Sequence, residues 1–318
     1  MSRFASLAYV LLLGCCSSFA AVDQGLLDLV PAGTKMISGV QAEKVKGSAL
    51  GQFVFAHMQR DNENFQHFIQ STGFDPRRDV QELLFASNGD PEHAQMIVIA
   101  RGYFDPARIK TAAVSAGGSV ESVAGVDLLI GKGSKEGGIA FLDNTLAIAG
   151  NRDLLRRMVA GRKSPASLDS QLESGLRRVS GEGDAWFVSL IPGSQFQAAP
   201  TMNVHGQEFS GAVIQSVLQS SGWIRFGETV KVNLQAVTRS DKDAQSLADV
   251  VRFLSSMIQM QKEGQPQAAV LAQALSGMQL RTDGSTMEMS LSVPEKGLEQ
   301  LIHSVPRVRP ASARSDEK

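Results

Sequence analysis

The clearest signal of the fold is the segment WIRFGETVKVNLQAV at residues 223–237. Its second half alternates apolar and polar residues, which is typical of a β-strand with one face on a core and the other in water. Gly227-Glu228 separates this strand from an apolar strand before it. Ser240 and Asp243 then form a capping-box pattern at the start of a helix. The segment therefore predicts a β-hairpin followed by an amphipathic helix.

The same element recurs along the chain. Near the C-terminus, Asp283-Gly284 is a two-residue hairpin signal between strand-like segments. In the first half, Asp105-Pro106 and Asn151 are helix-start signals. The further strand pairs that we predict are residues 83–86 with 96–100, 139–142 with 146–149, and 278–280 with 287–293. Hairpins that alternate with amphipathic helices indicate an α+β fold.

This recurrence predicts two similar units of antiparallel hairpins and amphipathic helices, and it suggests an internal duplication. We place the first α+β unit at residues 21–165 and the second at residues 166–305. Residues 192–211 are the least regular interior stretch, which predicts a long loop. Residues 306–318 mix proline, arginine and small polar residues, which predicts a disordered tail.

The N-terminus has the features of an export signal. Arg3 precedes an apolar run at residues 7–13, and small residues follow at 17–21. The apolar run is too short to span a bilayer, so this order is typical of a secretory signal peptide. We predict a signal peptide at residues 1–20, cleaved between Ala20 and Ala21. The mature protein is then exported to the periplasm or the medium.

Both cysteines, Cys15 and Cys16, lie inside this signal. Cleavage after Ala20 would leave a mature chain without disulfides or thiolate metal ligands. The cysteines also support an alternative, because Leu12-Leu13-Gly14-Cys15 approximates a lipobox. In that case Cys15 would be lipidated and would hold the protein at a membrane. No second apolar run reaches the length of a transmembrane helix, so we expect membrane contact only through Cys15.

Composition and spacing argue against several kinds of chemistry. Lys and Arg number 31 against 32 Asp and Glu, a net charge of −1, which gives no reason to expect a nucleic-acid partner. No GxSxG nucleophile motif is present. The histidines show neither HExxH nor HxH spacing; they are His57, His67, His93, His205 and His303. We therefore predict no catalytic residue, no cofactor and no metal ligand from the sequence.

Two segments are weaker candidates for a site. The glycine-rich residues 131–138 could bring backbone N–H groups to a phosphate, but they lack the GxxxxGK[ST] order and precede a strand. Asp75 and Asp79 could form a pair of acids on one helical face. Arg77 and Arg78 stand between them, and Asp before proline is a common helix cap. We interpret the first segment as a mobile loop and the second as a helix start.

Four stretches carry a resemblance that covers most of the predicted mature chain. They are residues 32–40, 47–53, 72–80 and 139–142. With them the chain resembles a functionally uncharacterised group of secreted proteins from acidobacteria-type bacteria. None of the four stretches is a catalytic signature. The resemblance implies export and this kind of fold, and it implies no activity.

The sequence thus leaves three hypotheses for function. The leading one is a secreted or periplasmic, non-enzymatic protein that binds an unknown protein or small ligand through a cleft or a sheet face. A second is an extracellular hydrolase whose carboxylate or serine site is assembled only in three dimensions. A third is a lipid-anchored envelope assembly factor, which depends on lipidation of Cys15.

Overall fold

The computed structural model describes residues 22–48, 51–52, 63–133, 137–161, 167–195, 202–204, 207–209, 212–260, 272–295 and 297. The predicted signal peptide, its cleavage residues Ala20 and Ala21, the candidate lipidation residue Cys15 and the predicted tail lie outside these residues. Within them, helices alternate with antiparallel strands, and the α+β class predicted from the hairpin pattern is confirmed.

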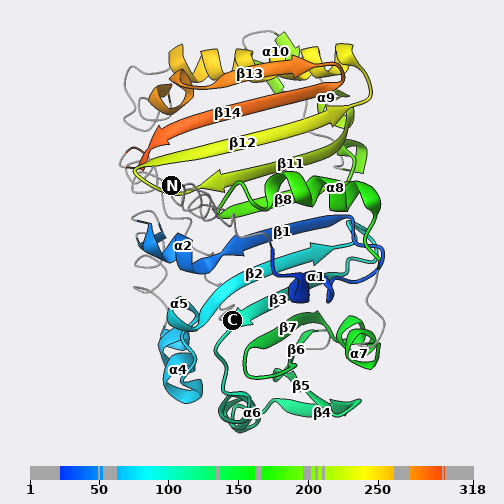
Figure 1. Cartoon of the computed structure of the whole chain (residues 1–318), viewed down its shortest axis with the longest axis vertical. Helices are drawn as coiled ribbons and strands as arrows, with labels where there is room; N and C mark the ends of the chain where they lie inside the picture. The colour runs from blue at the N-terminus through cyan, green and yellow to red at the C-terminus, as the bar shows by residue number, and fades with distance from the viewer. Residues whose placement is uncertain are drawn as a thin grey trace, which may run out of the picture.

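Twelve of the described strands form one antiparallel sheet, in the order β13-β14-β12-β11-β8-β1-β2-β3-β7-β6-β5-β4 (Figure 1). Their bounds are β1 (Met36–Gln41), β2 (Val80–Ser87), β3 (Met96–Gly102), β4 (Ser119–Val123), β5 (Val126–Ile130), β6 (Gly137–Phe141), β7 (Leu146–Asn151), β8 (Ala185–Ser189), β11 (Val217–Arg225), β12 (Thr229–Thr238), β13 (Gln279–Asp283) and β14 (Thr286–Pro294). Most neighbours in the sheet follow each other in the chain, as hairpins require.

The helices lie against the sheet and at its ends. They are α1 (Gln24–Leu27), α2 (Ala42–Gly47), α4 (Glu63–Thr72), α5 (Pro76–Asp79), α6 (Pro106–Ser115), α7 (Arg152–Ala160), α8 (Ser170–Val179), α9 (Ala212–Gln215) and α10 (Asp241–Met260), with the 3-10 turn η1 (Gly193–Gln195). The helix α8 packs on β8 and β11, and α10 packs on β12, β13 and β14 (Figure 1). At the other end of the sheet, α7 contacts β6 and β7, and α6 contacts β4 and β5.

The larger core forms on one face of the sheet because side chains alternate along each strand. The registers place a row of apolar residues opposite one another across five strands: Leu84, Ile99, Ile148, Ala140 and Leu128. Each of these side chains is at most 1% exposed. Helices α1, α7 and α8 add their own apolar residues to this cluster. A smaller cluster forms where α10 covers β12 and β14.

The two halves of the sheet meet where β1 pairs with β8. Gly39 on β1 lies opposite Trp186 on β8, and the buried indole ring rests directly over the glycine. A Cβ at Gly39 would stand 2.3 Å from the Trp186 ring, so only glycine fits this position. The pairing crosses the boundary that we predict between the two units. The residues on either side of it therefore share one sheet.

The predicted local signals form as expected. Asp105 accepts a hydrogen bond from the Arg108 backbone N–H at 3.0 Å and begins α6. Asn151 accepts from the Asp153 N–H at 3.0 Å and begins α7. The Ser240 hydroxyl accepts from the Asp243 N–H at 3.2 Å before α10. Gly284, in the β13–β14 turn, has the positive φ that this turn needs.

Two expectations change with the structure. Residues 192–211 are not an unstructured loop: they include η1 and a separate two-stranded sheet of β9 (Met202–Val204) and β10 (Gln207–Phe209). The sheet also does not establish an internal duplication. Four strands, β4 to β7, follow α6 in the first half, whereas β13 and β14 follow α10 in the second. The boundaries of the two units stay a prediction.

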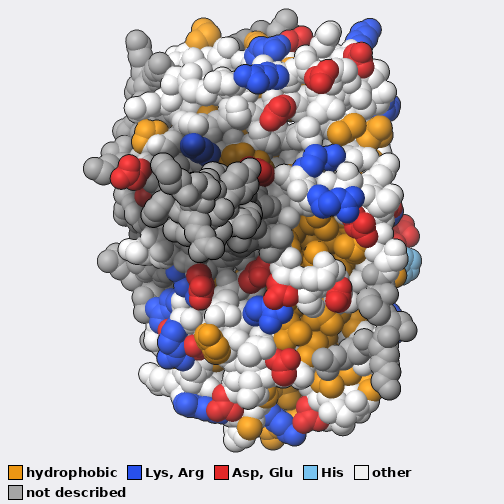
Figure 2. All heavy atoms as spheres, in the orientation of Figure 1, with side chains coloured by type: hydrophobic (Ala, Val, Ile, Leu, Met, Phe, Trp, Pro, Cys, Tyr) orange, Lys and Arg blue, Asp and Glu red, His pale blue; other side chains and the backbone are white. Residues whose placement is uncertain are grey.

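The surface in the view of Figure 2 mixes both signs of charge. Lys and Arg side chains are interspersed with Asp and Glu, and apolar side chains gather below α8 and beside α7. This face shows no field of a single sign that would attract a polyelectrolyte. Among the described residues, no helix is long and apolar enough to cross a membrane.

Candidate functional site

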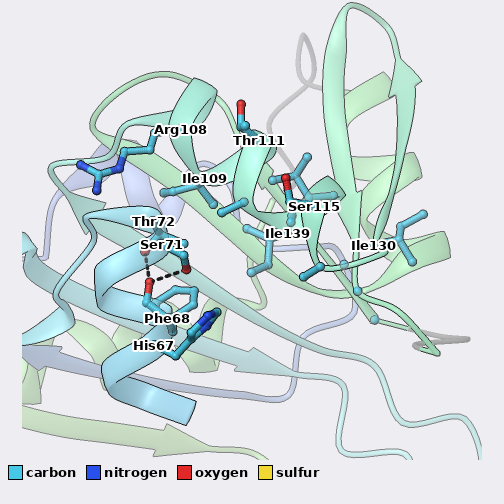
Figure 3. A pocket seen from close by; sticks show the side chains of 17 residues that line it. His67, Phe68, Ser71, Thr72, Arg108, Ile109, Thr111, Ser115, Ile130 and Ile139 are labelled. Atoms are coloured by element: carbon cyan, nitrogen blue, oxygen red, sulfur yellow. Dashed lines mark hydrogen bonds between the residues drawn. The ribbon is translucent and has the colours of Figure 1, made fainter. Parts of the chain in front are cut away.

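A cavity of about 840 Å³ lies between α4, α6 and the β5–β6 hairpin (Figure 3). We call it the α4–α6 pocket. Pockets for small ligands typically measure about 300–1,000 Å³. Most of its lining is apolar or glycine: Phe68, Ile109, Ala112, Ala113, Ala116, Leu129, Ile130, Gly131, Gly137, Gly138 and Ile139. All of its lining residues fall within the first of the two predicted units.

The wall made by α6 follows from its sequence. Asp105 and Pro106 set the start of the helix, and its buried residue Ile109 points toward the core side of the pocket. After that, Ala112, Ala113 and Ala116 present almost no side-chain volume. Small residues on consecutive turns leave room beside the helix, and this room is the pocket.

The opposite wall, α4, ends at a left-handed glycine. Gly73 has φ +71°, and its N–H donates to the Ile69 carbonyl at 2.8 Å. Arg108 reaches across from α6 and donates from Nη2 to the Gln70 carbonyl at 3.1 Å. A Cβ at Gly73 would lie 2.4 Å from Nη1 of Arg108. The glycine therefore makes room for the guanidinium, which joins the two walls at one end.

A row of four phenylalanines holds α4 to the sheet. Ring centroids are 6.2 Å apart for Phe68 and Phe74, 5.5 Å for Phe74 and Phe104, and 5.4 Å for Phe104 and Phe141. Contacts of this kind add about 0.5–1.5 kcal/mol per pair beyond burial. The row runs from the pocket-lining Phe68 to β6, so it fixes the distance between the wall and the hairpin.

The β5–β6 hairpin contributes side chains to both the core and the pocket lining. Leu128 pairs with Ala140, and both side chains are fully buried in the core. One residue further, Leu129 pairs with Ile139, and both line the pocket. Alternation along the strands puts the two pairs on opposite faces of the sheet. Ile139 is 42% exposed and Phe68 is 40% exposed, so the pocket presents apolar surface to solvent.

Three of the hydroxyl groups in the pocket lining, those of Ser71, Thr72 and Thr111, donate to carbonyls of their own helices. Thr72 and Ser71 donate to the Phe68 carbonyl at 2.7 and 3.1 Å, shown as dashed lines in Figure 3. Thr111 donates to the Ala107 carbonyl at 2.9 Å. The charged or ionisable side chains in the lining are His67 and Arg108.

The glycine-rich residues 131–138 connect β5 to β6, as expected for a loop between strands. Gly131, Gly137 and Gly138 line the α4–α6 pocket, while residues 134–136 lie outside the described part. This candidate segment therefore contributes to the pocket through its strand ends.

Asp75 and Asp79 form a helix start, as we interpreted them. Asp75 accepts from the Arg77 backbone N–H at 3.0 Å, and Asp79 accepts from the Asp75 N–H at 2.8 Å. Hydrogen bonds from Arg77 hold the pKa of Asp75 below its usual value. Burial pushes the pKa of Asp79 upward, but the Arg78 side chain and the Asp75 N–H outweigh it and lower that pKa. Both acids stay ionised, which suits caps and ion pairs.

The histidines are dispersed where they are described. His67 lines the α4–α6 pocket, and His93 lies on an exposed turn 3.7 Å from a carboxylate oxygen of Asp90. His57, His205 and His303 fall outside the described residues. Within the described part of the chain, no group of three His, Cys, Asp or Glu side chains is placed to hold a metal ion.

Sequence reasoning missed the pocket itself. Its walls come from α4 and α6, and its floor comes from a hairpin further along the chain. The local trace is an alanine stripe at the end of α6, formed by Ala112, Ala113 and the C-cap residue Ala116. Such a stripe is equally typical of close helix packing, so by itself it does not indicate a pocket.

Comparison with known proteins gives a fold and no family. No family model matches the chain, and no curated protein matches it. Among solved structures, crystal form III of TP0453 aligns with a TM-score of 0.54 at 9% identity, covering 90% of this chain and 100% of that chain. Crystal form I of TP0453 aligns with a TM-score of 0.50 at 10% identity, covering 90% and 98%. At such identities the likeness extends to the fold alone.

Proposed function

We propose that this protein is an exported, non-enzymatic binding protein that holds a small, mostly apolar molecule in the α4–α6 pocket. The observation that carries the proposal is a cavity of about 840 Å³ whose lining is dominated by aliphatic side chains and glycine. Each methylene group that a ligand buries there contributes about 0.8 kcal/mol. A modest apolar ligand can therefore bind without any specific polar contact.

The polar groups in the pocket favour binding over hydrolysis. The hydroxyls of Ser71, Thr72 and Thr111 donate to helix carbonyls, and His67, the described lining side chain that could act as a base, makes no hydrogen bond to them. A serine or carboxylate hydrolase needs a nucleophile within hydrogen-bond reach of a base. The binding hypothesis requires only the apolar walls.

A fluorescent apolar probe tests the proposal directly. N-phenylnaphthylamine is expected to brighten when it binds the protein. Ala112→Phe would fill the pocket from α6 and weaken probe affinity about tenfold or more, or ~1.4 kcal/mol. Val114→Phe is the matched control, because Val114 lies on the same helix, is 49% exposed and does not line the pocket.

The thermal midpoints of the two variants are measured alongside probe affinity. The proposal fails if the protein does not bind the probe, or if both phenylalanine variants bind it as well as the original chain does.

Export is the second part of the proposal. Expression in a secreting bacterial host, followed by intact-mass measurement of each fraction, identifies the first residue of the product. A soluble product that begins at Ala21 supports a freely exported binding protein. A membrane-bound product that begins at a lipidated Cys15 would replace it with the anchored alternative.

A further inference from the structure

The charge of the α4–α6 pocket is one-sided. Arg108 and His67 are among the residues that line it, and none of the lining residues that the structure describes is an Asp or Glu. Asp105, three residues before Arg108, uses its carboxylate to cap α6. A ligand that carried a positive charge would find no opposite charge in the lining. A ligand with a negative charge would find the guanidinium of Arg108.

The guanidinium of Arg108 is held in a defined place. It donates to the Gln70 carbonyl at 3.1 Å and lies against Gly73, where a side chain would collide with it. Arginine has five N–H donors, and this hydrogen bond uses one of them. A pre-positioned guanidinium loses little entropy when it binds a planar anion through two parallel hydrogen bonds.

The aliphatic part of the lining extends away from this charge, with polar side chains such as Thr111 and Ser115 beside it. In Figure 3, Arg108 lies at one end of the labelled side chains and Ile130 at the other, with Ile109 and Ile139 between them. The site thus has one polar end and a long aliphatic body. This arrangement fits a ligand with an anionic end and a single aliphatic chain.

We propose that the α4–α6 pocket binds a long-chain carboxylate, with the carboxylate on Arg108 and the chain along Ile109, Ile139 and Ile130. The inference rests on the proposed function, because it specifies the ligand of the same pocket. One fixed positive charge balances a monoanion. A doubly charged phosphate ester would leave one negative charge unpaired beside apolar walls, which is unfavourable.

Competition against N-phenylnaphthylamine compares dodecanoate with dodecanol, which share the chain and differ in the charged end. The original chain is expected to bind dodecanoate about tenfold more tightly than dodecanol, because a carboxylate and a guanidinium form a charge-assisted hydrogen-bonded pair. Arg108→Gln is expected to abolish this preference, because it weakens dodecanoate binding more than dodecanol binding. Arg108→Lys is expected to keep part of the preference, because it keeps the charge.

Lys110→Gln is the matched control, since it removes a positive charge from the same helix at a residue outside this lining. It is expected to leave the preference intact. The thermal midpoint of Arg108→Gln, measured beside its dodecanol affinity, shows whether the variant keeps the pocket folded.

The outcomes separate the two proposals. Equal binding of dodecanoate and dodecanol by the original chain overturns the carboxylate inference and leaves the binding function standing. A preference for dodecanoate that survives Arg108→Gln also overturns the carboxylate inference, because the carboxylate would then bind to another group. Failure of both ligands and of the probe overturns the proposed function itself.

Discussion

At the scale of single residues, the β4–β5 turn stores avoidable backbone strain. Val123 pairs with Val126, so the loop consists of Ala124 and Gly125, with φ +49° and +82°. A two-residue hairpin of this kind needs positive φ at both positions and favours Asn-Gly. Ala124 has a Cβ that disfavours this conformation, whereas asparagine tolerates it.

Ala124→Asn is expected to raise the free energy of unfolding by about 0.5–1 kcal/mol, because the turn keeps its shape with less strain. Urea denaturation of the two proteins measures the difference. Gly125→Ala is the opposing control: nothing lies within 4 Å of its would-be Cβ, so any loss of stability comes from φ alone. No gain from asparagine would contradict this account of the turn.

At the scale of elements, α7 is tied to the edge strand β4 by a carboxylate between two arginines. Glu121 accepts from Arg156 Nε at 2.7 Å and from Arg152 Nη2 at 2.7 Å. Hydrogen bonds from Arg156 and then Arg152 lower the pKa of Glu121 from 4.5 to about 2. A carboxyl whose pKa falls on folding stabilises the folded state above its unfolded pKa.

Glu121→Gln is therefore expected to be less stable than the original chain near neutral pH. The difference should persist down to about pH 4.5 and disappear as pH falls toward 2, where the carboxyl protonates in the folded protein too. Urea denaturation across this pH range measures it.

Glu173→Gln serves for comparison, because its ion pair with Arg177 at 3.6 Å is exposed on both sides and should contribute little. A stability difference that stays constant down to pH 2 would argue against the Glu121 ion pair as the cause.

At the scale of the whole molecule, the pairing of β1 with β8, which we call the β1–β8 joint, connects the two halves of the sheet. Gly39 and Trp186 face each other there, and the chain on either side adds hydrogen bonds from Gln41 N–H to Asp184 and from Leu190 N–H to Lys35, each 2.7 Å. Gly39→Ala would place a methyl group 2.3 Å from the indole. The indole or the strand must then move.

Gly39→Ala is expected to lower the free energy of unfolding by about 1–3 kcal/mol, the usual effect of overpacking a core. Chemical denaturation followed by tryptophan fluorescence reports the stability and the packing around Trp186 and Trp223, which lie opposite each other on β8 and β11. Ser38→Ala is the matched control, because the neighbouring side chain points to the other face of the same strand. Equal stability of the two variants would show that the joint tolerates a larger residue.

Much of the local structure could be predicted from the sequence. The alternation before Ser240, the Asp283-Gly284 turn and the caps at Asp105 and Asn151 depend on residues within a few positions of one another. The interactions that they predict are made by the same residues in the folded chain. The prediction of a long loop at residues 192–211 missed the strands β9 and β10. Each of these strands has three residues, which is too short to show a period in side-chain polarity.

The sequence by itself determined that this chain builds antiparallel hairpins and amphipathic helices, because turn chemistry and side-chain periodicity act over short distances. Only the tertiary structure decided that β8 pairs with β1, since that contact joins residues about 150 positions apart. It also decided that the small face of α6 lies opposite α4, which leaves a pocket. A cavity is the space that remains after distant segments pack, and no residue pattern along the chain encodes that space directly.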